Sequence, residues 1–156
     1  KGDYVELSAR PLYPFGYGLS YTQFSYRNLS ITPAEVAAGG SVAVSVEVTN
    51  VGAREGDEVV QLYVHLPAAS VTRPVKELKG FARVPLAPGQ TRRVTFHLAV
   101  SQLGFYDRRM QYVVEPGPVE VMVGSSSEDI RAAGSCAITG TATAVDKVFT
   151  SGVEVR

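Results

Sequence analysis

The sequence predicts an all-β protein, folded as an antiparallel sandwich of two sheets with about seven strands. Two observations support this fold class. Apolar and polar residues alternate with the period of two that half-buried strands show. Turn residues such as Gly, Pro and Asn interrupt these stretches at intervals of roughly 8 to 15 residues. Strands do not alternate with helical stretches, as they would in a parallel α/β sheet.

The first three strands are expected in the middle of the chain. Ser41–Asn50 (SVAVSVEVTN) places four valines on one face, which is typical of a half-buried strand. After a turn-rich stretch, Glu58–Leu66 has a centre that is apolar on both faces, as in a strand deep inside a sandwich. Leu78–Leu86 is a shorter and weaker candidate for the third strand.

The remaining four strands are expected in the second half of the chain. Proline and glycine in the turn Ala87–Gln90 lead into a strand over Thr91–Leu98. A second such turn joins the next two strands, and only Ser101–Asp107 has the composition of a helical turn. The last three strands are predicted at Met110–Val114, Val119–Val123 and Arg131–Thr139.

Both ends of the chain differ from this pattern. Residues 1–23 are rich in Tyr, Pro and Gly, and we interpret them as a linker between domains. Residues 24–138 would form the sandwich domain. Residues 139–156 are small, polar or β-branched, and we interpret them as a C-terminal extension or as a strand that pairs elsewhere.

Composition excludes several classes of function. Fifteen Lys and Arg residues balance fifteen Asp and Glu residues, so the chain has no overall field that would attract nucleic acid or a membrane surface. No apolar stretch approaches the ~18 residues that cross a bilayer. The single cysteine, Cys136, cannot form an internal disulfide, and we expect it to be a small buried residue of a strand.

The sequence offers no catalytic or metal site. Hydrolysis of a glycoside with retention needs two carboxyl groups about 5 Å apart across the sugar. The densest acidic cluster is Glu55, Asp57 and Glu58, which falls in a predicted turn where acids are simply well solvated. His65 and His97 lie far apart in the sequence, without a third ligand at a suitable spacing. We therefore expect neither a catalytic residue nor a cofactor in this chain.

Several motifs in a fixed order resemble a known family. These are Pro14–Thr22 (PFGYGLSYT), Glu58–Val64 (EVVQLYV), Thr72–Phe81 (TRPVKELKGF), Phe105–Asp107 (FYD) and Val114–Gly117 (VEPG). Together they resemble the fibronectin type III-like domain at the C-terminus of family 3 glycoside hydrolases, in the bacterial β-glucosidase branch. The agreement in order and spacing runs from about Leu12 to Ile130, which covers most of the chain.

The resemblance implies a non-catalytic role. In this family an aspartate nucleophile on a (β/α)8 barrel and an acid/base glutamate on an α/β-sandwich domain both precede the segment that Pro14–Thr22 resembles, and neither matches a position here. The resemblance thus implies an accessory domain that docks on and stabilises the barrel and the α/β-sandwich domain of a retaining β-glucosidase. It also implies a periplasmic or secreted protein, and a second copy of the chain is the alternative partner.

The aromatic linker is the first candidate docking surface. Phe15, Tyr17 and Tyr21 combine large apolar faces with polar tips, while Gly16 and Gly18 allow close approach of the backbone. We predict that these rings anchor the domain to its neighbours. The alternative is a platform on which sugars stack.

A basic stretch is the second candidate. Between Arg73 and Arg93, six basic residues face one acid, Glu77. A solvated strand face and docking against a neighbouring domain both explain this pattern, and nucleic-acid binding is the weakest explanation because the whole chain is neutral. The residues that we predict for docking in this stretch are Arg73, Lys76 and Lys79.

Two other functions remain as alternatives. A carbohydrate- or polymer-binding module would need exposed aromatic side chains on one face, and its candidates are Tyr63, Tyr106 and Tyr112. The chain lacks Trp, and we expect these tyrosines to be buried or half-buried. A free-standing adhesion sandwich is the third reading, because one fold hosts many functions.

Overall fold

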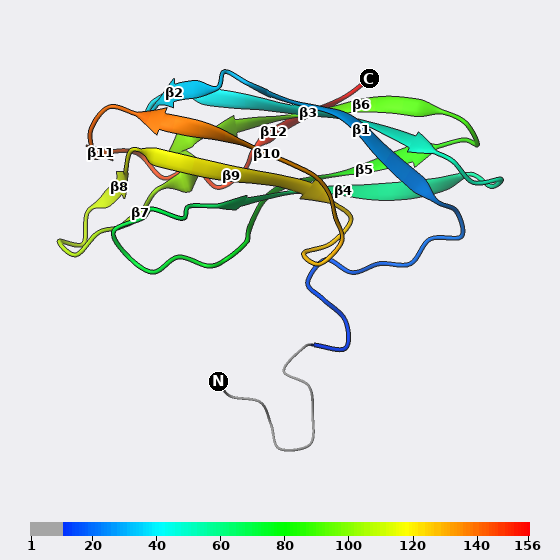
Figure 1. The fold of residues 1–156 in the computed structure, drawn as a ribbon, viewed down its shortest axis with the longest axis horizontal. Coiled ribbons are helices and arrows are strands. Elements are labelled where there is room, and N and C mark those ends of the chain that lie inside the picture. Colours follow the sequence, from blue (N-terminus) through cyan, green and yellow to red (C-terminus); the bar gives the residue numbers. More distant parts are fainter. Residues whose placement is uncertain (1–10) are drawn as a thin grey trace, which may run out of the picture.

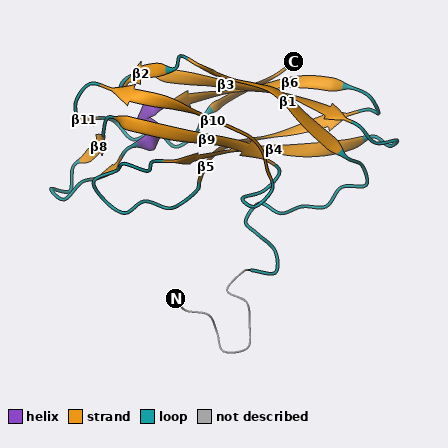
Figure 2. Ribbon diagram, in the orientation of Figure 1, coloured by secondary structure: helices purple, strands orange, loops and turns teal. Residues whose placement is uncertain are grey.

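The computed structural model describes residues 11–156, which form twelve strands and one short 3-10 turn (Figure 1). Strand and loop dominate the described chain, and the 3-10 turn is its only helical element (Figure 2). The elements are β1 Phe24–Thr32, β2 Glu35–Ala37, β3 Ser41–Asn50, β4 Gly56–His65, β5 Glu77–Leu86, β6 Thr91–Ala99, η1 Val100–Leu103, β7 Phe105–Tyr106, β8 Tyr112–Val114, β9 Gly117–Gly124, β10 Ile130–Thr139, β11 Thr143–Ala144 and β12 Gly152–Val155.

The strands form two main sheets that pack face to face (Figure 1). The first sheet has the order β1-β3-β6-β12, and the second has the order β2-β10-β9-β4-β5. A small third sheet, β11-β8-β7, closes one end. All pairs are antiparallel except β2 with β10, so the predicted two-sheet antiparallel sandwich of the all-β class is confirmed.

The core lies between the two sheets and consists mainly of branched aliphatic side chains. From the first sheet, β3 contributes its four valines and β6 contributes an alternating set around Phe96. From the second sheet, β4 and β9 contribute their inward valines and Leu62. The apolar positions of the period-two pattern are therefore the side chains that point into the core, because successive side chains point to opposite sides of a sheet.

Seven strands lie where the sequence predicts them, and β1, β2 and β7 were missed. Strand β1 pairs with β3, but its register shifts between Arg27 and Ser30, where Asn28 has a positive φ of 55°. This bulge breaks the alternation from which strands are recognised. The prediction that a strand begins at Met110 is wrong, because Met110 lies in a turn with φ 61° and β8 begins at Tyr112.

The C-terminal segment contributes to the sheets of the sandwich. Strand β11 pairs with β8, and β12 pairs with β6, with Val155 opposite Val94. Val155 also packs against the core. The segment 139–156, which the sequence marked as an extension, therefore supplies the edge strand of the first sheet.

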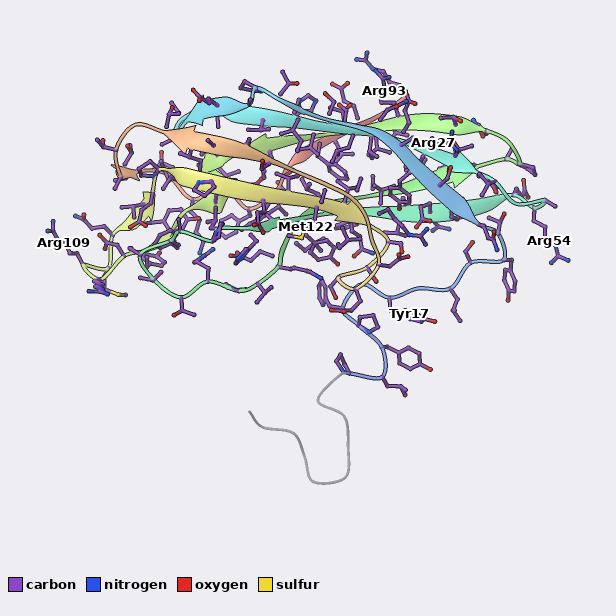
Figure 3. All side chains as sticks on the ribbon, in the orientation of Figure 1. Tyr17, Arg27, Arg54, Arg93, Arg109 and Met122 are labelled. Atoms are coloured by element: carbon purple, nitrogen blue, oxygen red, sulfur yellow. The ribbon has the colours of Figure 1, made fainter. Side chains whose placement is uncertain are left out.

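Three further features are the cysteine, the absence of a membrane-spanning helix among the described residues, and the positions of the loops at the ends of the sandwich. Cys136 is buried on β10, as expected. No helix within residues 11–156 is long and apolar enough to span a membrane. The β7–β8 hairpin with Arg109 and the β3–β4 turn with Arg54 lie at opposite ends of the sandwich, and Tyr17 lies on the linker that leaves one face between them (Figure 3).

Candidate functional site

The candidate site is built around the linker, whose backbone is fixed to the outer face of the second sheet. The Gln61 side chain on β4 donates from Nε2 to the carbonyl oxygens of Gly16 (2.9 Å) and Ser125 (2.6 Å). Its Oε1 accepts a hydrogen bond of 2.6 Å from the hydroxyl of Tyr63, which is buried two residues further along β4. The Ser127 amide donates to the carbonyl of Phe15 at 2.9 Å. One point of the linker is therefore held by a buried polar pair and by the β9–β10 loop.

A second anchor holds the other end of the linker at Asn50, which is fully buried. The Asn50 oxygen Oδ1 accepts from the Thr22 hydroxyl at 2.7 Å and from the Gly52 amide at 3.0 Å. Its Nδ2 donates to the carbonyls of Arg54 (2.7 Å) and Leu86 (2.9 Å). The side chain uses both donors and both lone pairs, so its burial costs little and it fixes where the linker meets β1.

Between these two anchors the aromatic side chains point outward. Phe15 is 66% exposed and Tyr21 is 92% exposed, while Tyr17 packs beside Tyr13 with ring centroids 5.1 Å apart. Exposed apolar residues near the linker are Val59, which shares a hollow with Tyr21, Val75, which shares one with Phe15, and Phe81 on β5, which lies opposite Gln61. We call this surface the docking face, and its exposed apolar members are Phe15, Tyr17, Leu19, Tyr21, Val59, Val75 and Phe81.

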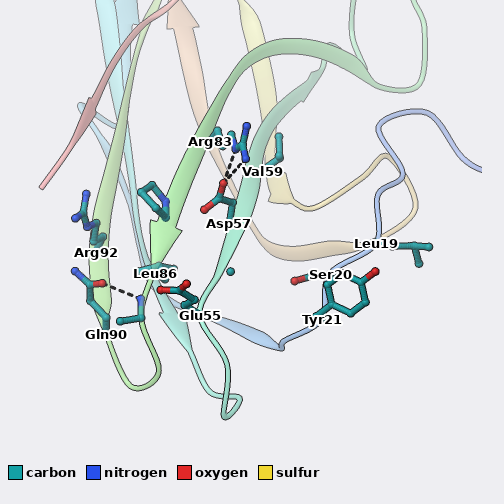
Figure 4. A pocket seen from close by; sticks show the side chains of 13 residues that line it. Leu19, Ser20, Tyr21, Glu55, Asp57, Val59, Arg83, Leu86, Gln90 and Arg92 are labelled. Carbon is teal, nitrogen blue, oxygen red and sulfur yellow. Dashed lines mark hydrogen bonds and ion pairs between the residues drawn. The ribbon is translucent and has the colours of Figure 1, made fainter.

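Two hollows of the docking face lie beside Tyr21 and Phe15. One hollow of about 860 Å³ lies between the linker at Tyr21 and the strands β4 and β5, beside the ion pair of Asp57 and Arg83 (Figure 4). The other, of about 510 Å³, lies between Phe15 and Val75 and has Tyr63 among its lining residues. Exposed apolar side chains beside such hollows are typical of contact sites.

Two ion pairs lie at the docking face. Arg83 Nε donates to Asp57 at 2.6 Å. Arg131 binds both carboxylate oxygens of Asp129, at 2.6 and 2.7 Å, and this holds the pKa of Asp129 below its usual range. Desolvation raises the pKa of Glu58, which lies nearby on β4. The two ion pairs thus leave no unpaired charge on Asp57, Arg83, Asp129 or Arg131 at this surface.

The basic residues predicted for docking take part in contacts inside the chain. Arg73 donates to Glu77 Oε1 at 2.6 Å and lies over the Phe105 ring at 5.0 Å. Lys79 donates to Glu77 Oε2 at 3.1 Å and to the Gln102 carbonyl at 2.9 Å. One carboxylate therefore joins the loop before β5 to η1.

Lys76, the third basic residue, ties this loop to the β9–β10 loop. Its ammonium donates to the Ser127 carbonyl and lies 4.0 Å from Glu128. All three basic side chains are largely covered, and their contacts hold the loop at the border of the docking face. A direct role of Arg73, Lys76 and Lys79 in docking stays a prediction.

The acidic cluster and the histidines are separated by the fold. Asp57 is paired with Arg83, and Glu58 accepts from the Val59 amide at 3.0 Å. His65 faces the Pro74 carbonyl at 3.2 Å, whereas His97 on the other sheet faces Glu154 at 3.4 Å. Within the described residues, no group of three side chains is arranged to hold a metal ion.

The three tyrosines considered for sugar binding have different surroundings. Tyr63 is buried under the linker, which agrees with the expectation of a core residue. Tyr112 is partly covered, with its hydroxyl 3.3 Å from the Ser101 carbonyl. Tyr106 is 53% exposed and meets the Tyr112 ring edge-on, with centroids 5.4 Å apart. The last two form a cluster at the β7–β8 hairpin, away from the linker.

Known proteins resemble this chain in both sequence and structure. Residues 58–127 match the family described as a fibronectin type III-like domain. A β-xylosidase from Formosa agariphila is 48% identical over 128 residues, which are 82% of this chain and 18% of that protein. A periplasmic β-glucosidase from Salmonella typhimurium is 42% identical over 128 residues, which are 82% of this chain and 17% of that protein.

A solved structure agrees with these sequence matches. The β-glucosidase from Listeria innocua in complex with glucose superposes with a TM-score of 0.83 and 40% identity, over 89% of this chain and 19% of that one. The chain thus spans less than a fifth of the length of these three relatives. It belongs to the fibronectin type III-like domains of the family 3 β-glucosidases and β-xylosidases.

Proposed function

We propose that the chain is the non-catalytic accessory domain of a retaining β-glucosidase or a closely related β-glycosidase. In this proposal the docking face packs against the catalytic barrel and the α/β-sandwich domain of the parent enzyme and stabilises them. One observation supports it most strongly: the linker backbone is fixed at Gln61 and at Asn50, while its aromatic side chains are directed away from the domain.

The physical argument is one of pre-organisation. An exposed aromatic ring gains about 2 kcal/mol when a neighbouring domain covers it. A free linker would lose part of this gain in the entropy of ordering its backbone, but here that order exists before docking. Since Asp57 is already paired with Arg83 and Asp129 with Arg131, covering the face does not bury an isolated charge from these four residues.

The relatives support a location for the parent enzyme. One of them is described as a periplasmic β-glucosidase, and two others are described as β-xylosidases. We propose a periplasmic or secreted parent enzyme that hydrolyses terminal β-linked sugars. Its catalytic residues would lie in the part of those relatives that this chain does not match.

A chimeric enzyme tests the docking role. The matching segment of the Listeria innocua β-glucosidase is replaced by this chain, and thermal unfolding and hydrolysis of a chromogenic β-glucoside are measured. We expect a soluble, active enzyme whose melting temperature falls by about 5 °C or more when Phe15, Tyr17 and Tyr21 are changed to Ser together, because buried contact is lost.

The control changes an exposed aromatic residue outside the docking face, Tyr106→Ser, and should lower the melting temperature of the chimera far less than the triple change does. If the triple variant has the same melting temperature as the unmodified chimera, the linker does not dock and the proposal fails. The isolated chain should not hydrolyse the β-glucoside at all. Activity of the isolated chain would contradict a non-catalytic role and would direct attention to Glu55, Asp57 and Glu58.

A further inference from the structure

A separate pocket of about 320 Å³ lies near the β7–β8 hairpin. It is formed by that hairpin, by the loop before β5, by η1 and by the segment that precedes β12. None of the exposed apolar side chains that define the docking face lines it. Covering the docking face would therefore use none of the rings that line this pocket.

Aromatic rings from two distant parts of the sequence meet at this pocket. Tyr106 and Tyr112 come from the hairpin, and Phe149, which is 79% exposed, comes from the C-terminal segment. The ammonium of Lys147 lies 5.8, 5.6 and 5.2 Å from the centroids of Tyr106, Tyr112 and Phe149. These cation–π contacts hold the C-terminal segment beside the hairpin, with large parts of Tyr106 and Phe149 still open to solvent.

Polar groups also line the pocket, and they include both donors and acceptors. Arg73, Lys79 and the carboxylate of Glu77 line it. Two buried side-chain donors of lining residues, Arg73 Nε and Gln102 Nε2, have no hydrogen-bond partner within the described part of the chain. Gln102 is only 3% exposed, so its unpaired Nε2 donor is destabilising, as is typical of a buried polar group without a hydrogen bond.

We propose that this pocket binds a neutral saccharide of one or two pyranose units. A pyranose ring presents C–H faces that stack on aromatic rings and hydroxyl groups that both donate and accept hydrogen bonds. The pocket provides both aromatic rings and mixed donors and acceptors, and its volume is at the lower end of the range of about 300–1,000 Å³ for small-molecule sites.

Titration of the isolated chain with cellobiose tests this inference. The chain has eight Tyr and no Trp, so tyrosine fluorescence reports on the rings, and amide chemical shifts around Tyr106 and Phe149 locate the site. We expect saturable binding, with a dissociation constant that rises roughly tenfold in Tyr106→Ala and in Phe149→Ala, because each change removes a stacking face.

Two controls make the result decisive. Tyr21→Ala removes an exposed ring of the docking face and should leave binding unchanged. Sorbitol carries hydroxyl groups without a ring face and should not bind. Absence of saturable shifts, equal binding of sorbitol, or unchanged affinity in Tyr106→Ala would each overturn the inference, provided that amide spectra show the variants folded. The docking proposal does not depend on this result.

Discussion

Gly16 decides the course of the linker at the scale of a single residue. It has a φ of +78°, a region that side chains other than glycine rarely adopt. A Cβ atom at this position would collide with the side chain of Gln61 and the hydroxyl of Tyr63. Gly18, two residues later, has open space where its Cβ would be. The two glycines of the same motif therefore have different structural roles.

This difference predicts unequal effects of alanine at the two positions. Gly16→Ala should weaken attachment of the linker by about 1 to 3 kcal/mol, because it adds backbone strain and displaces Gln61. The readout is hydrogen exchange of the Ser127 amide, which donates to the Phe15 carbonyl and should lose its protection. Gly18→Ala is the matched control and should leave that exchange rate unchanged. Equal exchange in both variants would contradict the anchor.

Glu58 predicts a dependence of stability on pH. Burial is the main cause that raises its pKa in the folded chain, and Asp129 raises it further, while the Val59 amide, Arg131 and Tyr26 lower it. A carboxyl group with a raised pKa favours the folded state while it is protonated. Its contribution is complete below the pKa of the unfolded chain and is lost as the pH rises through the folded pKa.

Glu58→Gln keeps the neutral form at every pH and removes this loss. Between about pH 4 and pH 7 the wild-type chain should lose free energy of unfolding relative to the variant, because only the wild type must ionise a buried carboxyl group. Denaturant unfolding at several pH values measures the difference. Glu55→Gln, at an exposed position in the preceding turn, serves as control. A difference between wild type and Glu58→Gln that does not change with pH would refute the assignment.

At the scale of elements, the C-terminal segment completes the first sheet. Strand β12 pairs with β6 from Gly152 opposite His97 to Val155 opposite Val94. Just before it, the Ser151 hydroxyl is 2.9 Å from the Lys79 carbonyl and 2.7 Å from Gln102 Oε1. The segment thus connects the edge of the first sheet with the loop network around Glu77.

Removal of residues 141–156 should therefore destabilise the sandwich. We expect a loss of about 1 to 3 kcal/mol in the free energy of unfolding, because Val155 leaves the core and the β6 edge loses its partner. Ser151→Ala should cost about 1 kcal/mol, since it removes polar contacts but keeps the strand. Thr141→Ala, at an exposed site, should change nothing. Unfolding curves of the truncated and full chains that superimpose would show that β12 is dispensable.

At the scale of the whole molecule, one core joins both main sheets. Buried side chains from β3, β6, β4, β9 and β10 belong to a single hydrophobic cluster. The docking face and the aromatic pocket lie outside this cluster, so each can be altered without opening the core. This separation would allow a stable domain to present the two contact surfaces that we propose.

A single core predicts cooperative unfolding of the isolated chain. Circular dichroism and tyrosine fluorescence should follow one transition with the same midpoint, because small single domains unfold without populated intermediates. The linker tyrosines lie outside the core, so their fluorescence does not report on core unfolding. A variant with Tyr13, Tyr17 and Tyr21 changed to Phe removes their contribution from the fluorescence curve. Transitions that remain separate in this variant would show that the two sheets unfold independently.

Much of the fold could be predicted from local patterns. Ser41–Asn50 reads as a strand because its inward valines follow the period of a sheet, and this period is a property of the backbone alone. Strand β1 was not predicted because a bulge at Asn28 interrupts the alternation of its inward and outward side chains. Strand β12 was not assigned to this sandwich because a local sequence pattern does not show which strand a short strand pairs with. Its pairing with β6 depends on contacts between residues that are distant in sequence.

The sequence by itself determined the all-β class, the core strands and, through the motifs of the linker and the loop before β5, the family. Only the tertiary structure decided how the candidate residues are used. It pairs Arg73 and Lys79 with Glu77, turns Phe15 and Tyr21 outward, and brings Phe149 to Tyr106. The type of a side chain limits which contacts it can make. Its actual partners depend on which chain segments lie beside it, and these segments come together only when the two sheets pack.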